Sequence, residues 1–63
     1  MKIEIFYNNE YICTTIKSKT CREAIKTFID SLDTLPNFFR AKMLEMTPQG
    51  IDTNKIKAYK TPN

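Results

Sequence analysis

Residues 20–35, with the sequence TCREAIKTFIDSLDTL, carry the clearest structural pattern in this chain. Thr20 and Glu23 have the spacing of a capping box, in which two side chains bind free backbone N–H groups at the start of a helix. Pro36 disfavours helical backbone at Leu35 and ends the pattern. Between these limits, apolar residues recur at helical spacing, at Cys21, Ile25, Phe28, Ile29 and Leu32. We therefore predict an amphipathic helix over residues 21–34, whose apolar stripe needs a surface to cover.

Two extended segments precede this helix. Residues 2–7 and 11–17 are rich in β-branched and aromatic side chains, and Asn8-Asn9 suits a two-residue turn with positive φ. Such a turn places three pairs of residues opposite each other: Phe6 and Tyr11, Ile5 and Ile12, and Ile3 and Thr14. It also gathers four isoleucines on one face, namely Ile3, Ile5, Ile12 and Ile16. A loop that is one residue longer scatters them over both faces, so the sequence favours the shorter turn.

The segment after Pro36 has two interpretations. The first is a strand over residues 40–46, joined by a type I turn at Thr47-Pro48-Gln49-Gly50 to a strand over residues 54–60. The last strand then directs Ile56 and Ala58 to the core. The second is a helix over residues 36–46, because most residues there are good helix formers and a helical stripe runs through Leu35, Phe39, Met43 and Met46. We favour the strand and leave the helix open.

These expectations describe one small α+β domain over residues 1–63, with ββαββ order and one helix packed on one face of a small sheet. The alternative is ββααβ. The order resembles the ubiquitin-like β-grasp arrangement, in which a hairpin near the N-terminus is followed by a helix that crosses the sheet. The resemblance covers the element order alone. The C-terminal Gly-Gly of that family is absent from Lys60-Thr61-Pro62-Asn63, so the resemblance does not imply a carrier function.

The composition excludes several classes of chemistry. The chain has a net charge of +3, two cysteines, one glycine and no histidine. Without histidine there is no ready general base near neutral pH, and the common zinc-binding patterns are excluded. With Gly50 as the single glycine, the sequence has no phosphate-binding loop. We predict a protein that is not an enzyme and has no catalytic residues, no cofactor, no metal and no small-molecule substrate.

The sequence also gives expectations about location. No segment has the apolar length of a signal peptide or a membrane span, so we expect a cytoplasmic protein with no membrane partner. Cys13 and Cys21 are then interpreted as reduced, small buried hydrophobes, with a disulfide and a reactive thiol as the alternatives. Lysine, isoleucine and asparagine are common, which is typical of AT-rich coding sequence and favours a bacterial or phage source.

The most suggestive functional feature is the sheet face that one helix leaves uncovered. The straight register places seven residues there: Lys2, Glu4, Phe6, Tyr11, Cys13, Thr15 and Lys17. The residues that we expect to bind a partner are Phe6, Tyr11 and Tyr59 together with Lys2, Lys17 and Lys57. Three interpretations are open: a cross-strand pair that only stabilises the sheet, a surface for a partner protein or a homodimer, and a stacking platform for single-stranded nucleic acid.

We predict a small interaction or regulatory module that binds a partner protein or itself through this face. Single-stranded nucleic-acid binding is the alternative, and Glu4, the scarcity of arginine and the modest net charge weigh against it. A second apolar cluster has two interpretations, as core or as a partner interface. It comprises Phe38, Phe39, Met43, Leu44 and Met46.

Overall fold

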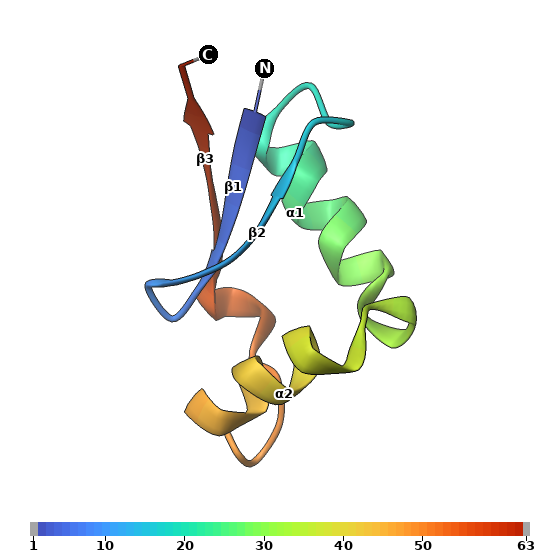
Figure 1. The fold of residues 1–63 in the computed structure, drawn as a ribbon, viewed down its shortest axis with the longest axis vertical. Coiled ribbons are helices and arrows are strands. Elements are labelled where there is room, and N and C mark those ends of the chain that lie inside the picture. The colour runs from blue at the N-terminus through green and yellow to red at the C-terminus, as the bar shows by residue number, and fades with distance from the viewer. Residues whose placement is uncertain (1, 63) are drawn as a thin grey trace.

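Three antiparallel strands form one sheet in the order β2-β1-β3, and two helices lie between the second and third strands in the chain (Figure 1). The computed structural model describes residues 2–62. Its elements are β1 (Lys2–Tyr7), β2 (Glu10–Thr15), α1 (Cys21–Asp30), the 3₁₀ turn η1 (Leu32–Thr34), α2 (Asn37–Met46), the 3₁₀ turn η2 (Thr53–Lys55) and β3 (Ile56–Thr61). The α+β class is confirmed, with the ββααβ order of the alternative.

The strand predicted over residues 40–46 is wrong, because this segment belongs to α2. The expected turn is present, since the Gly50 N–H donates to the Thr47 carbonyl at 3.0 Å. It connects α2 to the loop before β3, however, and so the second hairpin of the ubiquitin-like layout is replaced by a helix. The physical reason is that residues 40–46 are good helix formers whose stripe, through Phe39, Met43 and Met46, packs against the core.

The two-residue turn at Asn8-Asn9 is confirmed. Both residues have positive φ, at 52° and 69°, as a type I′ turn requires. Next to the turn, Phe6 is paired with Tyr11 as predicted. The N–H of Asn8 also donates to the Lys55 carbonyl at 3.0 Å, which ties the turn to the segment that enters β3.

A β-bulge changes the register beyond this point. The shift falls between Ile5 and Phe6 of β1, where Ile12 is the extra residue of β2. Ile5 therefore lies opposite Cys13 instead of Ile12, and Ile3 lies opposite Thr15 instead of Thr14. A bulge opposes two residues to one and strengthens the local twist. Ile12 is buried and Cys13 packs against the same core, so the bulge directs two neighbouring residues toward the helices.

The bulge corrects the faces predicted for the residues that follow it in β2. Cys13 and Thr15 were expected on the uncovered face, and both are aligned with the core-facing residues of β1. Ile16 was expected in the core, but β2 ends at Thr15 and Ile16 is 73% exposed. A strand has a side-chain period of two, so one inserted residue exchanges the faces of every residue that follows it.

Helix α1 begins where the sequence predicts. Thr20 is its N-cap, and the hydroxyl of this residue accepts a hydrogen bond of 3.0 Å from the Glu23 N–H. The helix ends at Asp30, earlier than expected, and tightens into η1, because serine, aspartate and threonine are weak helix formers. Ala24 and Phe28 are buried against the sheet, and the predicted stripe packs around them.

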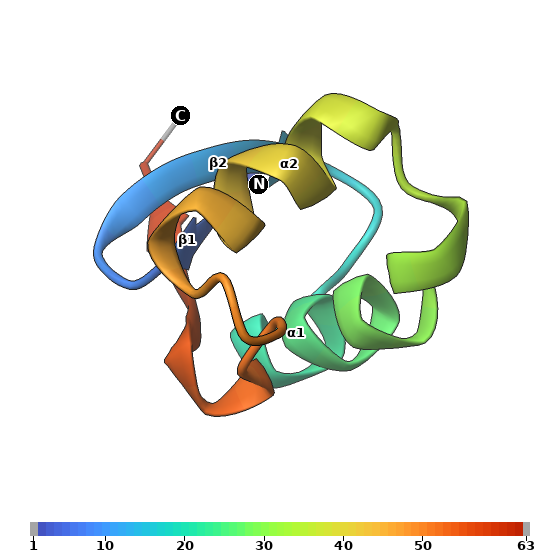
Figure 2. The ribbon, with the colours of Figure 1, turned by 90° about the horizontal axis from the view of Figure 1, so that it is seen from below.

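Helix α2 lies at the end of the sheet that carries the β1–β2 turn (Figures 1 and 2). It begins after Pro36, which has extended backbone and ends the preceding segment. Met43 is its one fully buried residue. Within residues 2–62, neither helix has the length and apolar character needed to cross a membrane.

The core lies between the sheet and the two helices and contains Ile3, Ile5, Tyr7, Ile12, Ala24, Phe28, Met43 and Ile56. Tyr7 is completely buried and its hydroxyl has two partners. The hydroxyl accepts a hydrogen bond of 2.8 Å from the Asp52 N–H, and it is hydrogen-bonded to Thr47 Oγ1. Because the Thr47 hydroxyl donates to the Met43 carbonyl, Tyr7 is the donor to Thr47. One side chain thus joins β1, the end of α2 and the loop before β3.

Candidate functional site

Three aromatic rings lie together on the sheet face that the helices leave uncovered. Phe6 of β1 is in the middle, with its ring centroid 5.9 Å from that of Tyr11 on β2 and 5.4 Å from that of Tyr59 on β3. Both contacts are edge-to-face, with an angle of 77° between the ring planes, which is a favourable geometry for aromatic pairs. We call these three residues the aromatic face. Tyr11 is 44% exposed and Tyr59 is 53% exposed, so both rings remain open to solvent.

The bulge in β2 holds Tyr11 in place. Its hydroxyl shares a hydrogen bond of 2.6 Å with Thr14 Oγ1. In a regular strand, residues three apart point to opposite faces. The extra residue at Ile12 brings Tyr11 and Thr14 to the same face, which makes this bond feasible. The backbone of Tyr11 is also fixed, because Lys42 Nζ of α2 donates to its carbonyl at 2.7 Å.

Charged residues stand beside the rings in a mixed pattern. Lys57 of β3 is directly opposite Phe6, and Glu4 of β1 lies between Thr14 on one side and Tyr59 on the other. Lys2 is two residues before Glu4 on the same strand and is opposite Thr61. The face therefore carries two cations at its borders and one carboxylate near its centre.

The structure brings together five of the six residues expected to bind a partner. They are Phe6, Tyr11, Tyr59, Lys2 and Lys57, all on the uncovered side of the sheet. Lys17 is separate from them. It lies in the bend after β2, where its backbone N–H donates to Thr15 Oγ1 at 3.3 Å. Thr14 belongs to the face and sequence reasoning missed it, because the bulge that turns it outward leaves no signal in the hydrophobic pattern.

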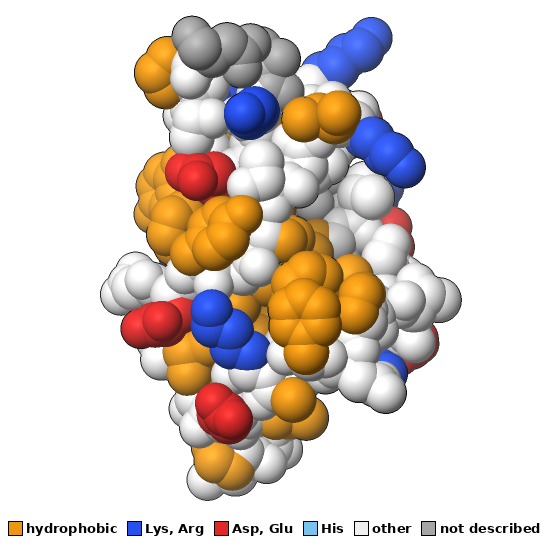
Figure 3. Space-filling model, viewed as in Figure 1, with side chains coloured by type: hydrophobic (Ala, Val, Ile, Leu, Met, Phe, Trp, Pro, Cys, Tyr) orange, Lys and Arg blue, Asp and Glu red, His pale blue; other side chains and the backbone are white. Residues whose placement is uncertain are grey.

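A second aromatic group lies on helix α2. The rings of Phe38 and Phe39 are 4.1 Å apart at their centroids, and Phe38 is 65% exposed whereas Phe39 packs partly on the core. Figure 3 shows hydrophobic side chains gathered over the strands and again over the start of α2, with charged side chains between them. The second apolar cluster of the sequence is therefore divided. Met43 belongs to the core, Phe39 and Met46 pack partly against the core, and Phe38 and Leu44 are exposed.

Neither cysteine is part of a disulfide. Cys13 and Cys21 are both free and half-buried, and both pack against the core. Burial raises the pKa of the Cys13 thiol above its ordinary value. Because the thiolate is the nucleophilic form, this shift disfavours the reactive-thiol interpretation of Cys13. The environment of both residues is that of small hydrophobes.

The site therefore offers apolar contact area with a charged border. Among residues 2–62, no group of three cysteine, aspartate or glutamate side chains is close enough to hold a metal ion. The aromatic rings, Lys57 and Lys2 provide surface for association through burial, stacking and charge. No family model matches the chain, and no match is found among the curated proteins or among the solved structures.

Proposed function

We propose that the protein is a non-enzymatic interaction module that binds a partner protein through its aromatic face. The observation that carries this proposal is the row of three contacting rings on an uncovered sheet face, two of them half-exposed to solvent. Tyrosine and phenylalanine are enriched in the centres of protein interfaces, and tyrosine is among the residues that contribute most binding energy there. Burial of these rings provides the affinity, and the lysines orient the partner and increase the association rate.

The size of the face sets the extent of the interface. Three six-residue strands cover roughly 15 by 20 Å, or about 300 Å². A stable interface buries about 800 Å² on each partner. Figure 3 shows, on one broad side of the molecule, hydrophobic side chains over the strands and a further hydrophobic group over the start of α2. Because the strands alone are smaller than a standard interface, we propose that the partner also contacts Phe38 of α2, which is 65% exposed.

The test compares two variants of the full chain. Tyr11→Ala with Tyr59→Ala removes the two exposed rings and leaves Phe6 in place, whereas Ile16→Ala removes an exposed apolar residue outside the face. The partner is first captured from the source cells on immobilised protein and then purified. The affinity of the purified partner for the double variant should be more than about 100-fold lower than for the wild type, because two central aromatic residues are lost. The affinity for Ile16→Ala should change little. Equal binding by the double variant and the wild type refutes the proposal, provided that circular dichroism shows both to be folded.

Single-stranded nucleic acid is the second candidate, and the observation that favours it is Lys57 directly opposite Phe6. Bases stack on aromatic rings while lysines contact phosphates. The carboxylate of Glu4, which is directly opposite Tyr59, and ring faces already used in edge contacts weigh against it. A titration with a single-stranded oligothymidine decides between the two. Binding that weakens steeply with increasing salt supports the nucleic-acid function, whereas a protein partner held by buried rings responds weakly to salt.

A further inference from the structure

Strand β3 has one edge without a strand partner, because it is an outer strand in the order β2-β1-β3. The pairing with β1 shows which backbone groups lie on that edge. The Asn8 N–H donates to the carbonyl of Lys55, the residue just before β3. In an antiparallel pair, residues bonded to the partner strand alternate with residues that face away from it. The outward residues of β3 are therefore Ile56, Ala58 and Lys60.

The first part of this edge is covered and the rest is open. The Ile56 N–H donates to the Thr53 carbonyl of η2, which agrees with its outward direction. Within residues 2–62, no hydrogen bond involves the backbone groups of Ala58 or Lys60 on this side. Both helices lie on one face of the sheet (Figures 1 and 2). The second half of β3 thus offers N–H and C=O groups to an additional strand.

The open half of the edge is basic on both faces of the sheet. Lys57 and Lys60 are exposed, and side chains three residues apart on a strand point to opposite faces. Lys57 is opposite Phe6 on the side of the aromatic face, so Lys60 is on the helix side. Residues 53–61 contain no aspartate or glutamate. The carboxylate of Glu4 belongs to the inner strand β1.

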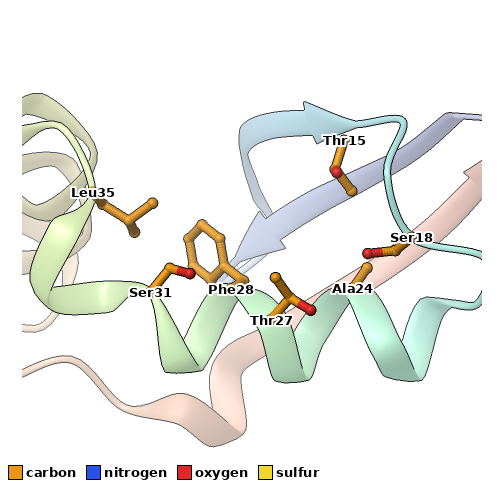
Figure 4. A pocket seen from close by; sticks show the side chains of 7 residues that line it. All are labelled: Thr15, Ser18, Ala24, Thr27, Phe28, Ser31 and Leu35. Atoms are coloured by element: carbon orange, nitrogen blue, oxygen red, sulfur yellow. The ribbon is translucent and has the colours of Figure 1, made fainter.

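Helix α1 adds a third cation on the helix side. A pocket between β2 and α1 is lined by Thr15, Ala24 and Ser31 among others (Figure 4), so the two helical residues mark the side of α1 toward β2. Arg22 lies about 160° around the helix from Ala24 and about 180° from Ser31. Because α1 packs mainly on β3 and β1 and begins where β3 ends (Figure 1), Arg22 is on the same side as Lys60.

The other residues of α1 do not reverse this charge. Glu23 and Asp30 are exposed and lie about 120–140° around the helix from the buried residues, so they point away from the sheet. Lys26 is three and four residues from these two carboxylates and lies beside both. Ile25 is half-buried and lies between the buried stripe and Arg22, which places apolar surface next to the basic flank.

These charges exclude one occupant and favour another. Lysines on an edge strand keep like strands apart, and pairing between two copies of β3 would bring Lys57 and Lys60 of both copies together. Like charges on neighbouring strands are destabilising, whereas opposite charges stabilise the pairing. The edge is therefore complementary to a strand that carries carboxylates and not to a second copy of itself.

From these observations we propose that the open edge of β3 binds an acidic, extended peptide segment of a partner. The segment runs antiparallel to β3 and bonds to the outward backbone groups of Ala58 and Lys60. It carries two carboxylates three residues apart, one beside Lys57 and the other beside Lys60 and Arg22. Strand addition obtains affinity from main-chain hydrogen bonds and specificity from alternate side chains. The site is an edge and not a face of the sheet, and it does not depend on the function proposed for the aromatic face.

The probe is a blocked peptide with the sequence Thr-Glu-Val-Val-Glu-Val, which has the six-residue length of β3. In the proposed register its second residue is opposite Lys60 and its fifth is opposite Lys57. It is titrated at low salt into the ¹⁵N-labelled full chain. Amide shifts are expected in β3 and at Arg22 and Ile25, and the amides of Ala58 and Lys60 should exchange more slowly with solvent.

Two matched peptides test the register. The isomer Thr-Glu-Val-Glu-Val-Val has the same composition and charge, but its carboxylates lie on one face, so it should bind about tenfold more weakly, a change of about 1.4 kcal/mol. The N–H of the fourth residue points to Ala58 and that of the third points to solvent. N-methylation of the fourth residue should therefore weaken binding at least about tenfold, and N-methylation of the third should change it less than about twofold.

Charge reversal in the protein is the second test. Lys57→Glu with Lys60→Glu should abolish binding of the acidic peptide and create binding of Thr-Lys-Val-Val-Lys-Val, which does not bind the wild type. The control is Lys17→Glu with Arg40→Glu, which changes the net charge equally but lies in the bend after β2 and on α2. This control should keep its affinity for the acidic peptide within about threefold.

Four results overturn the proposal. These are equal binding by the two isomeric peptides, equal effects of N-methylation at the third and fourth residues, shifts centred on Phe6 and Tyr11, and equal losses for the two charge-reversed variants. A fifth is slower exchange at Ala58 when only the protein concentration is raised, since a second copy then occupies the edge. Binding of the basic peptide by the reversed variant supports the proposal and shows that this variant is folded.

Discussion

The hydroxyl of Tyr7 is the buried polar group on which three segments converge. A tyrosine without exposed surface is stable only if its hydroxyl finds partners, since an unpaired buried polar group costs about 1–3 kcal/mol. Here the oxygen accepts from Asp52 and the proton goes to Thr47. The hydroxyl thus acts as both donor and acceptor, and its two partners are 40 and 45 residues away in the sequence.

Tyr7→Phe should therefore destabilise the protein by about 1–2 kcal/mol, because the Asp52 N–H and the Thr47 hydroxyl each lose a buried partner. Urea unfolding followed by circular dichroism measures the change. Tyr59→Phe is the matched control, since it removes a hydroxyl from a half-exposed ring and should shift the midpoint very little. Equal midpoints for Tyr7→Phe and wild type would show that the two hydrogen bonds contribute nothing.

For individual residues, the sequence predicted some pairing partners and sheet faces correctly and others wrongly. The Phe6–Tyr11 pair follows from the two-residue turn, and Ile56 faces the core as the alternation in the last strand indicated. The network of Tyr7 could not be predicted, because its partners come from a helix end and a loop that no local pattern places. Thr14 was assigned to the wrong face for a related reason: its orientation depends on the bulge.

At the scale of elements, helix α2 is attached to the core through Met43. This residue has no exposed surface, whereas its neighbour Leu44 is 40% exposed. The other contacts come from half-buried residues, namely Phe39 and Met46. An element of ten residues that buries one side chain completely depends strongly on that side chain.

Met43→Ala should cost about 2–4 kcal/mol, from lost burial and from the cavity that remains. A domain of this size has a total stability of only about 3–9 kcal/mol, so the loss is a large share. Leu44→Ala, one position away, should cost less than about 1 kcal/mol because the side chain is partly solvated and alanine favours the helix. Chemical denaturation of both variants provides the measurement. Similar losses for the two would mean that α2 is not anchored at Met43.

Helix α2 also shows why the sequence alone left both a strand and a helix open for the segment after Pro36. Phenylalanine, leucine and methionine at residues 38–46 pack well in either a strand or a helix, and the Thr47–Gly50 turn is compatible with both. Tertiary packing decides between them: the helix directs Met43 into the core and places Lys42 beside the Tyr11 carbonyl. The bulge in β2 is a similar case. It exists because Ile12 and Cys13 both pack on the core, and a period-two pattern contains no sign of it.

Across the whole molecule, local opening should require the most free energy in the centre of the sheet. β1 is paired on both sides and contributes three of the core residues, Ile3, Ile5 and Tyr7. The segment from η1 to α2 contributes one. Local opening requires less free energy where few apolar side chains are buried.

Native-state hydrogen exchange should therefore show the slowest amides in β1 and faster exchange in η1 and the first turn of α2. The amides of β1 should exchange only by global unfolding, so added denaturant accelerates them as steeply as it accelerates unfolding measured by circular dichroism. If the amides of α2 are as well protected as those of β1, the domain opens as one unit and this order is wrong.

The antiparallel pairing of β1 with β3 has a mechanical consequence. Lys2 is paired with Thr61, so the chain enters and leaves the sheet at the same end (Figure 1). Tension applied between these two residues loads the hydrogen bonds between the strands one after another, because each bond is perpendicular to the strands. The domain then unzips at low force from that end, whereas strands pulled in shear resist with several bonds at once.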